Sequence, residues 1–169
     1  MTRRAAVPLA ALGLLAAPSA LAQTAVPDYR SMFVQYGGKT VQAKLGSYCH
    51  PNAQGTGECL ELDPKKDYPL KDAATITVRQ GEDVTLLFKH TVSHLAWRAA
   101  RIDGLGEERI TWTGTGRAVT KTFRRWKIKL PRTMARSSDV LGFDVNYPNA
   151  YSSFEVRIKV LKARAAAKK

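Results

Sequence analysis

Short stretches of alternating apolar and polar residues run through most of the chain. The clearest covers residues 154–160, Phe-Glu-Val-Arg-Ile-Lys-Val, in which every second residue is apolar and the residues between are charged. This period of two is typical of a strand with one face on a core and the other in water. Further strands are predicted at 40–45, 59–62, 75–79, 83–88, 95–102, 109–113, 119–130 and 140–145.

A strand–turn–strand signal lies in the middle of the chain. Residues 75–79 and 83–88 are rich in β-branched and aliphatic side chains and flank Gln80-Gly81-Glu82, a turn that contains glycine. This combination predicts a strand, a turn and a second strand. No long segment repeats with a period of 3.6 residues. Eight or nine short strands at this spacing predict an all-β sandwich.

The N-terminus has the pattern of a cleavable export signal. Arg3 and Arg4 precede an apolar run over 5–17, and Ala20-Leu21-Ala22 supplies the small residues of a cleavage site. The run is shorter than the roughly 20 apolar residues of a membrane-spanning helix. No cysteine stands at the cleavage point, which disfavours a lipoprotein. We therefore expect a periplasmic or secreted chain without a transmembrane segment, exported by either the Sec or the twin-arginine route.

The pattern predicts one structured domain with short extensions. Residues 1–22 are the expected signal peptide, and 23–38 a flexible lead-in with a candidate first strand. The sandwich domain is expected over 39–161. Residues 162–169 are rich in alanine and basic residues and offer no apolar stripe to bury, so we expect a basic C-terminal tail.

The chain is strongly basic. It has 27 Lys and Arg against 14 Asp and Glu, a formal charge of +13, and +11 remains after removal of Arg3 and Arg4. Such an excess predicts attraction to polyanions: acidic glycans, anionic lipid head groups, teichoic-type polymers or nucleic acid. Export disfavours nucleic acid. The charge also fits a simpler purpose, which is to keep an exported domain in solution.

The two cysteines, Cys49 and Cys59, are expected to pair, because disulfides form readily in exported proteins. Closing so short a loop stabilises the fold by about 2.5–3 kcal/mol in the chain-entropy treatment. The alternative is a pair of reactive or metal-binding thiols, for which the spacing gives no support.

Several of these features together resemble a known group of proteins. The segment Gly46-Ser47-Tyr48-Cys49, the second cysteine, the Gly81 hairpin and the closing strand at 151–160 are similar to those of small secreted bacterial proteins and lipoproteins. That group has an immunoglobulin-like sandwich and a Gly-Ser-Tyr-Cys-Trp type segment. The chain departs from it at His50 and lacks the lipid-anchor cysteine. Over 45–160 the resemblance implies export and a single immunoglobulin-like antiparallel β-sandwich with one disulfide, and it supplies no catalytic residues.

The densest charged segment is 121–130, Lys-Thr-Phe-Arg-Arg-Trp-Lys-Ile-Lys-Leu. On one strand, Arg125, Lys127 and Lys129 would share a face at a spacing of about 7 Å. Such a row suits a chain of phosphates, sulfates or carboxylates. It equally fits a sheet face that long cations keep wet and protect from edge pairing. The candidate polyanion-binding residues are Arg124, Arg125, Lys127, Lys129 and Arg132.

Other chemistry has less support. His90 and His94, with His50 as a third ligand, form a metal site only if a turn brings them together. Asp139 and Asp144 could serve a glycosidase only if they converge. The aromatic residues favour core packing, with a carbohydrate platform as the alternative: Trp97, Trp112, Trp126, Tyr147 and Tyr151.

No catalytic or cofactor motif is found, so no cofactor is implied and an enzyme is not favoured. The leading hypothesis is a non-catalytic binding or accessory module of the cell envelope that recognises an anionic polymer or a partner protein. The alternatives are a hydrolase acting on envelope material and a periplasmic metal-handling protein.

Overall fold

The structure, a computed structural model, describes residues 28–51, 56–62, 72–103 and 107–165. Within these residues the chain forms twelve β-strands and no helix. The expected signal peptide and its cleavage site lie outside the described residues. No helix in the described part has the length and apolar character needed to cross a membrane.

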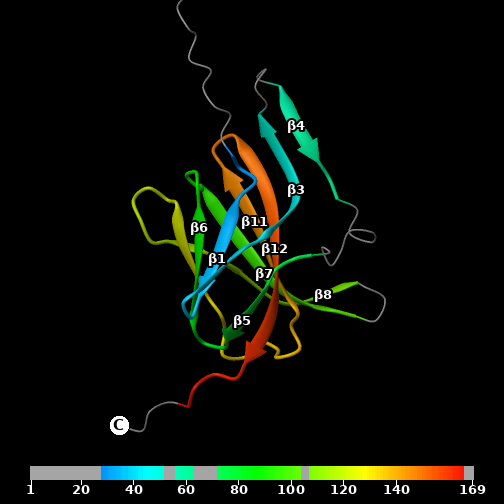
Figure 1. The fold of residues 1–169 in the computed structure, drawn as a ribbon, viewed down its shortest axis with the longest axis vertical. Helices are drawn as coiled ribbons and strands as arrows, with labels where there is room; N and C mark the ends of the chain where they lie inside the picture. Colours follow the sequence, from blue (N-terminus) through cyan, green and yellow to red (C-terminus); the bar gives the residue numbers. More distant parts are fainter. Residues whose placement is uncertain (1–27, 52–55, 63–71, 104–106, 166–169) are drawn as a thin grey trace, which may run out of the picture.

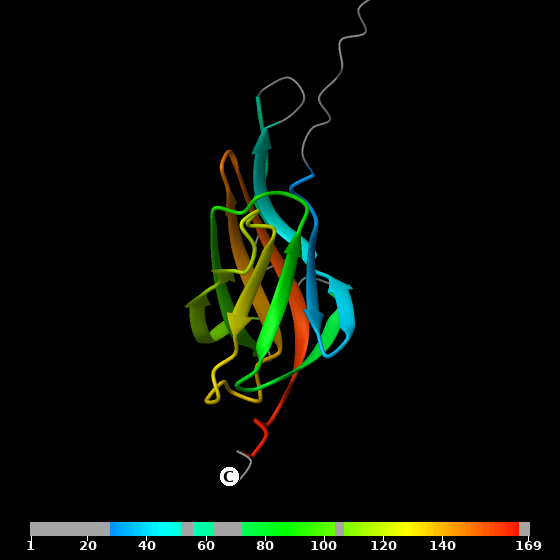
Figure 2. The same ribbon diagram turned by 90° about the vertical axis from the view of Figure 1, so that its left-hand side faces the viewer.

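The first sheet has five strands in the order β2-β1-β6-β10-β9, all antiparallel to their neighbours. Figure 2 looks onto this sheet, with β6 and β10 in front of the orange strands of the other layer. Its strands are β1 (Met32–Tyr36), β2 (Lys39–Gln42), β6 (Asp83–Phe88), β9 (Arg117–Ala118) and β10 (Arg125–Lys129).

The second sheet has seven strands. Six follow the order β4-β3-β12-β11-β7-β8, and β5 pairs in parallel with the C-terminal half of β12 (Figure 1). The strands are β3 (Lys44–Pro51), β4 (Gly57–Leu60), β5 (Thr75–Arg79), β7 (His94–Ile102), β8 (Glu108–Thr115), β11 (Val140–Tyr147) and β12 (Ala150–Leu161).

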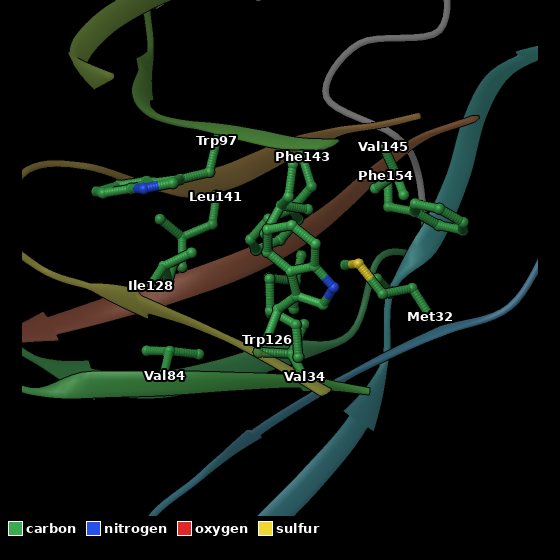
Figure 3. Packing of buried hydrophobic residues seen from close by; sticks show 14 of the residues in the cluster. Met32, Val34, Val84, Trp97, Trp126, Ile128, Leu141, Phe143, Val145 and Phe154 are labelled. Atoms are coloured by element: carbon green, nitrogen blue, oxygen red, sulfur yellow. The ribbon is translucent and has the colours of Figure 1, made fainter. Parts of the chain in front are cut away.

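The core lies between the two sheets and is formed by the inward-facing residues of each strand. Val34, Val84 and Ile128 of the first sheet face Leu141 and Phe143 of the second, and all are at most 2% exposed (Figure 3). Burial of this apolar surface is the dominant stabilising contribution to such a fold. The alternation in sequence therefore marks the faces that the sandwich buries.

The strand order is that of an immunoglobulin-like sandwich. The set β12-β11-β7-β8 packs against β6-β10-β9, and Trp97 is buried on β7, the strand that carries the core tryptophan in this fold. The expected fold class is thus confirmed. The disulfide does not join the two sheets, as the disulfide of antibody domains does. Cys49 and Cys59 are cross-strand partners in the β3–β4 hairpin, which projects from the body of the sandwich (Figure 1).

Two predicted strands are interrupted. The one expected at 40–45 bends at Ala43, which is buried and whose N–H donates to the Met32 carbonyl at 2.9 Å. The one expected at 119–130 begins only at Arg125. Before it lies a turn in which Phe123 has a φ of 52° and its carbonyl accepts a hydrogen bond from the Trp126 indole at 2.9 Å.

Candidate functional site

The outer face of the five-stranded sheet carries the row of cations on β10. Trp126 and Ile128 point into the core, 6% and 0% exposed, so strand alternation turns Arg125, Lys127 and Lys129 outward. Arg125 and Lys129 are exposed, and Lys127 is half-buried. The three side chains therefore lie on one face of a single strand.

The other two sequence candidates lie at opposite ends of β10. Arg124 is exposed in the turn before the strand, where its carbonyl accepts a hydrogen bond from the Phe88 N–H at 2.9 Å. Arg132 is exposed beyond the other end. Its side chain crosses Gly81, where a Cβ would lie only 2.9 Å from Arg132 Cγ. The five candidates thus extend along the whole length of β10 but do not converge on one point.

Strand pairing adds a cation that sequence reasoning missed. Arg117 on β9 is the cross-strand partner of Lys127 and is exposed. Neighbouring strands lie about 4.8 Å apart, so the backbone positions of Arg117 and Lys127 are closer together than alternate positions along β10. Arg117 lies outside the dense basic segment, and nothing short of the β9–β10 register identifies it.

The basic face is only partly neutralised. Asp83 on β6 is the cross-strand partner of Lys129, and its carboxylate lies 3.7 Å from Lys127 Nζ. Both side chains of that ion pair are more than a third exposed, so solvent screening leaves it little energetic weight. The side chains of Arg117, Arg125, Lys127 and Lys129 thus carry four positive charges, against the single negative charge of Asp83.

An apolar strip borders the cations. Phe33 on β1 pairs with Leu87 on β6, and Leu87 pairs with Arg125. The Val119 N–H donates to the Arg125 carbonyl at 2.8 Å, and Val119 is 45% exposed. Phe33 and Leu87 alternate with the buried Val34 and Leu86, so they face outward. Outward cations and outward apolar side chains therefore lie side by side on this sheet face.

The opposite sheet carries a separate charged network around Arg98 on β7. Its guanidinium lies 2.8 Å from Glu108, 2.8 Å from Glu155 and 3.7 Å from Asp144. Burial alone would lower the pKa of Arg98, but the three carboxylates raise it above its ordinary value. The Tyr151 hydroxyl also donates to Asp144, at 3.2 Å. These carboxylates are committed to an ion-pair network.

The two carboxylates proposed for a glycosidase have separate partners. Asp144 belongs to the Arg98 network, whereas Asp139 accepts a hydrogen bond from the Ile102 N–H at 3.1 Å. The structure gives each a partner in the fold rather than placing both at a shared cleft.

A histidine and a serine do come together. His50 Nε2 lies 2.7 Å from Ser152 Oγ, and that hydroxyl also donates to the Tyr29 carbonyl at 3.0 Å. Ser152 is 0% and His50 5% exposed. Burial lowers the pKa of His50 below its ordinary value, and Arg30 acts in the same direction. The pair joins β3 and β12 to the residues before β1, and a substrate could reach it only after the fold opened.

Two of the histidines pack against the same aromatic ring. The centroid of the Tyr29 ring lies 5.1 Å from that of His90 and 5.3 Å from that of His50. His94 is exposed at the start of β7. Within the described ranges, no group of three His, Cys, Asp or Glu side chains is placed to hold a metal ion.

The aromatic residues divide between the core and its edges. Trp97, Trp126 and Tyr147 are buried, Tyr151 is half-buried, and Trp112 on the edge strand β8 is 40% exposed. They are distributed over both sheets and do not form one flat platform.

Comparisons with known proteins leave the family open. No family model matches the chain. No curated protein matches it. Among solved structures, it is similar to a chain of the ZIG-8–RIG-5 IG1–IG1 heterodimer, with 18% identity over 54% of this chain and 85% of that chain and a TM-score of 0.32. That likeness is too slight to carry an argument, and the strand order assigns the fold.

Proposed function

We propose that this chain is an exported, non-catalytic binding module of the cell envelope that recognises an anionic polymer on the outer face of its five-stranded sheet. The observation that carries the proposal is the placement of Arg117, Arg125, Lys127 and Lys129 on one sheet face, next to an apolar strip.

The spacing of the cations supports a linear ligand. Cations at alternate positions of β10 lie about 7 Å apart, and Arg117 widens the row across to β9. A polymer that carries carboxylates or phosphates at regular intervals can contact several of these cations at once. Phe33 and Leu87 give the same ligand an apolar surface to rest on.

Two further observations support export. The N-terminal residues have the pattern of a signal peptide. The Cys49–Cys59 disulfide fits a protein that lies outside the reducing cytoplasm. The envelope offers acidic glycans and phosphate polymers as partners for a basic exported domain.

The test compares two pairs of charge reversals. The first is Arg125→Glu with Lys127→Glu on β10. The control is Arg157→Glu with Lys159→Glu on β12, which has the same residue types, the same spacing and the same change in net charge, on the other sheet. Binding is measured against polygalacturonate, poly(glycerol phosphate) and neutral dextran.

We expect the parent chain to bind at least one of the two anionic polymers and not dextran, with affinity that falls as salt rises. The β10 pair should weaken binding at least tenfold, and the β12 pair much less, because it changes only the overall charge. Equal losses from the two pairs would show that binding follows net charge, and the proposed face would be wrong.

A further inference from the structure

A second basic feature lies at the end of the sandwich where β12 leaves the body, the lower end in Figure 1. There a cavity of about 300 Å³ opens between the β1–β2 turn, β5 and the residues after β12. Volumes of this size are at the lower end of those found for small-molecule sites. Its walls include Tyr36, Lys39, Arg79, Glu82, Leu161 and Arg164.

Glu82 is held in place within this cavity. It accepts a hydrogen bond from the Tyr36 hydroxyl, and its carboxylate lies 3.3 Å from Arg164 Nε and 3.7 Å from Arg79 Nε. Arg79 is itself fixed, because it donates to the Lys162 carbonyl at 2.8 Å. Burial and the neighbouring Glu82 raise the pKa of Tyr36, so its hydroxyl keeps the proton that it donates.

The charges in the cavity do not balance. Lys39, Arg79 and Arg164 contribute three positive charges against the single carboxylate of Glu82. The Tyr36 ring and the Leu161 side chain add apolar wall. An anionic group can pair with Lys39 and Arg164, while the Glu82 carboxylate can accept hydrogen bonds from hydroxyl groups. Sugars that bear an acidic group offer this combination of chemistry.

The cavity is close in space to the end of the basic row on β10. The Glu82 carbonyl accepts a hydrogen bond from the Leu130 N–H at 3.0 Å, just after β10 ends. Asp83, which follows Glu82 in the chain, is the cross-strand partner of Lys129. The turn that positions Glu82 therefore also fixes the lower end of the cation row.

We propose that this cavity binds the terminal sugar of an anionic polymer, a pyranose that carries a carboxylate or a phosphate. This inference rests on the proposed function, because the interior of the same polymer would lie along β10. Lys39 and Arg164 pair with the acidic group, and the Tyr36 ring supports the sugar. The domain would then recognise chain ends as well as repeating charge.

The test uses three monosaccharides as probes: glucuronate, glucose 6-phosphate and neutral glucose. Each is titrated into the full chain, and the backbone amides around Tyr36 and Leu161 are followed by NMR. The cavity variant is Lys39→Ala with Arg164→Ala. The control is Lys159→Ala with Arg157→Ala, which removes one Lys and one Arg from exposed positions on β12.

We expect at least one acidic sugar to shift the cavity amides, and glucose to bind at least tenfold more weakly. The cavity variant should lose at least tenfold in affinity, whereas the control should keep it. Arg79 is left unchanged because its bond to the Lys162 carbonyl supports the fold.

The inference is overturned if neither acid shifts these amides, if glucose binds as well as the acids, or if the two variants lose affinity equally. Measuring polymer binding by the Arg125→Glu/Lys127→Glu variant separates this result from the proposed function. If that variant loses affinity for the polymer but the parent chain binds neither acidic sugar, the cavity proposal alone is refuted. If the parent chain binds an acidic sugar but that variant keeps its affinity for the polymer, the β10 face is refuted, and the cavity is left as a site for a free sugar acid.

Discussion

Arg98 and Glu155 form an ion pair across an intervening strand. Arg98 lies on β7 and Glu155 on β12, with β11 between them, yet Nη2 of the arginine is 2.8 Å from Oε1 of the glutamate. Gly142 on β11 is the cross-strand partner of both residues. Since Gly142 has no side chain, the guanidinium can lie over the β11 backbone and reach the next strand.

This relationship predicts the effect of adding one methyl group. In Gly142→Ala, the new Cβ would lie 2.5 Å from Arg98 Cζ, so the guanidinium must move off its carboxylates. We expect the free energy of unfolding to fall by about 1–3 kcal/mol, measured by urea denaturation. Gly57→Ala is the control, because a Cβ there meets no atom within 4 Å. Similar losses in the two variants would contradict the steric explanation.

Removing the Arg98 guanidinium should lower the free energy of unfolding by more than Gly142→Ala does. In Arg98→Met, Glu108 and Glu155 lose the cation that neutralises them, and Glu155 is only 6% exposed. We expect a loss of about 3 kcal/mol in unfolding free energy at neutral pH. Arg157→Met, an exposed cation on the same face, should change it by no more than about 0.5 kcal/mol.

The buried His50 makes the stability of the fold depend on pH. Its pKa in the folded chain is lowered by burial, so below about pH 6.5 the unfolded chain binds the proton more readily. Its contribution to stability is present above that pH and is lost as the pH falls toward the folded pKa. The slope contributed by this one group is at most about 1.4 kcal/mol per pH unit.

The measurement is urea unfolding between pH 8 and pH 5 for the parent chain and His50→Gln. The glutamine retains a group able to hydrogen bond to Ser152 but does not titrate. We expect a shallower slope in the variant. Identical slopes would mean that His50 contributes nothing to the pH dependence.

The disulfide predicts a loss of stability without a change of fold. Cys49 and Cys59 join the β3–β4 hairpin, and neither side chain is buried in the core. We expect Cys49→Ala/Cys59→Ala to lose up to about 3 kcal/mol through the entropy of the freed loop. Far-UV circular dichroism should stay that of a β-sandwich. Reducing agent should destabilise the parent and leave the variant unaffected; an equal effect on both would contradict this account.

Several strands could be predicted from the chain because burial of one face imposes a period of two. β5 and β6 occupy the residues that the alternation predicts, and β12 contains the clearest of them. The hairpin expected around Gly81 is wrong, because β5 and β6 lie in different sheets. The strand predicted at 119–130 was too long, because the bond from the Trp126 indole to the Phe123 carbonyl closes a turn that local composition does not reveal. The bend at Ala43 likewise depends on its hydrogen bond to Met32, a residue on another strand.

The candidate site divides in the same way. Alternation along β10 is a local property, so the common face of Arg125, Lys127 and Lys129 follows from the sequence once a strand is assumed. The positions of Arg117, Phe33 and the cavity around Glu82 depend on which strands are neighbours and in what register.

The sequence by itself determined the all-β class, the pairing of the two cysteines and the outward face of β10, because each depends on residues close together in the chain. Only the tertiary structure decided that Gly142 leaves a path from Arg98 to Glu155, and that β5 runs parallel to the end of β12. The local pattern sets which face of each strand is buried. Which strands distant in the sequence become neighbours is decided only when the whole core packs.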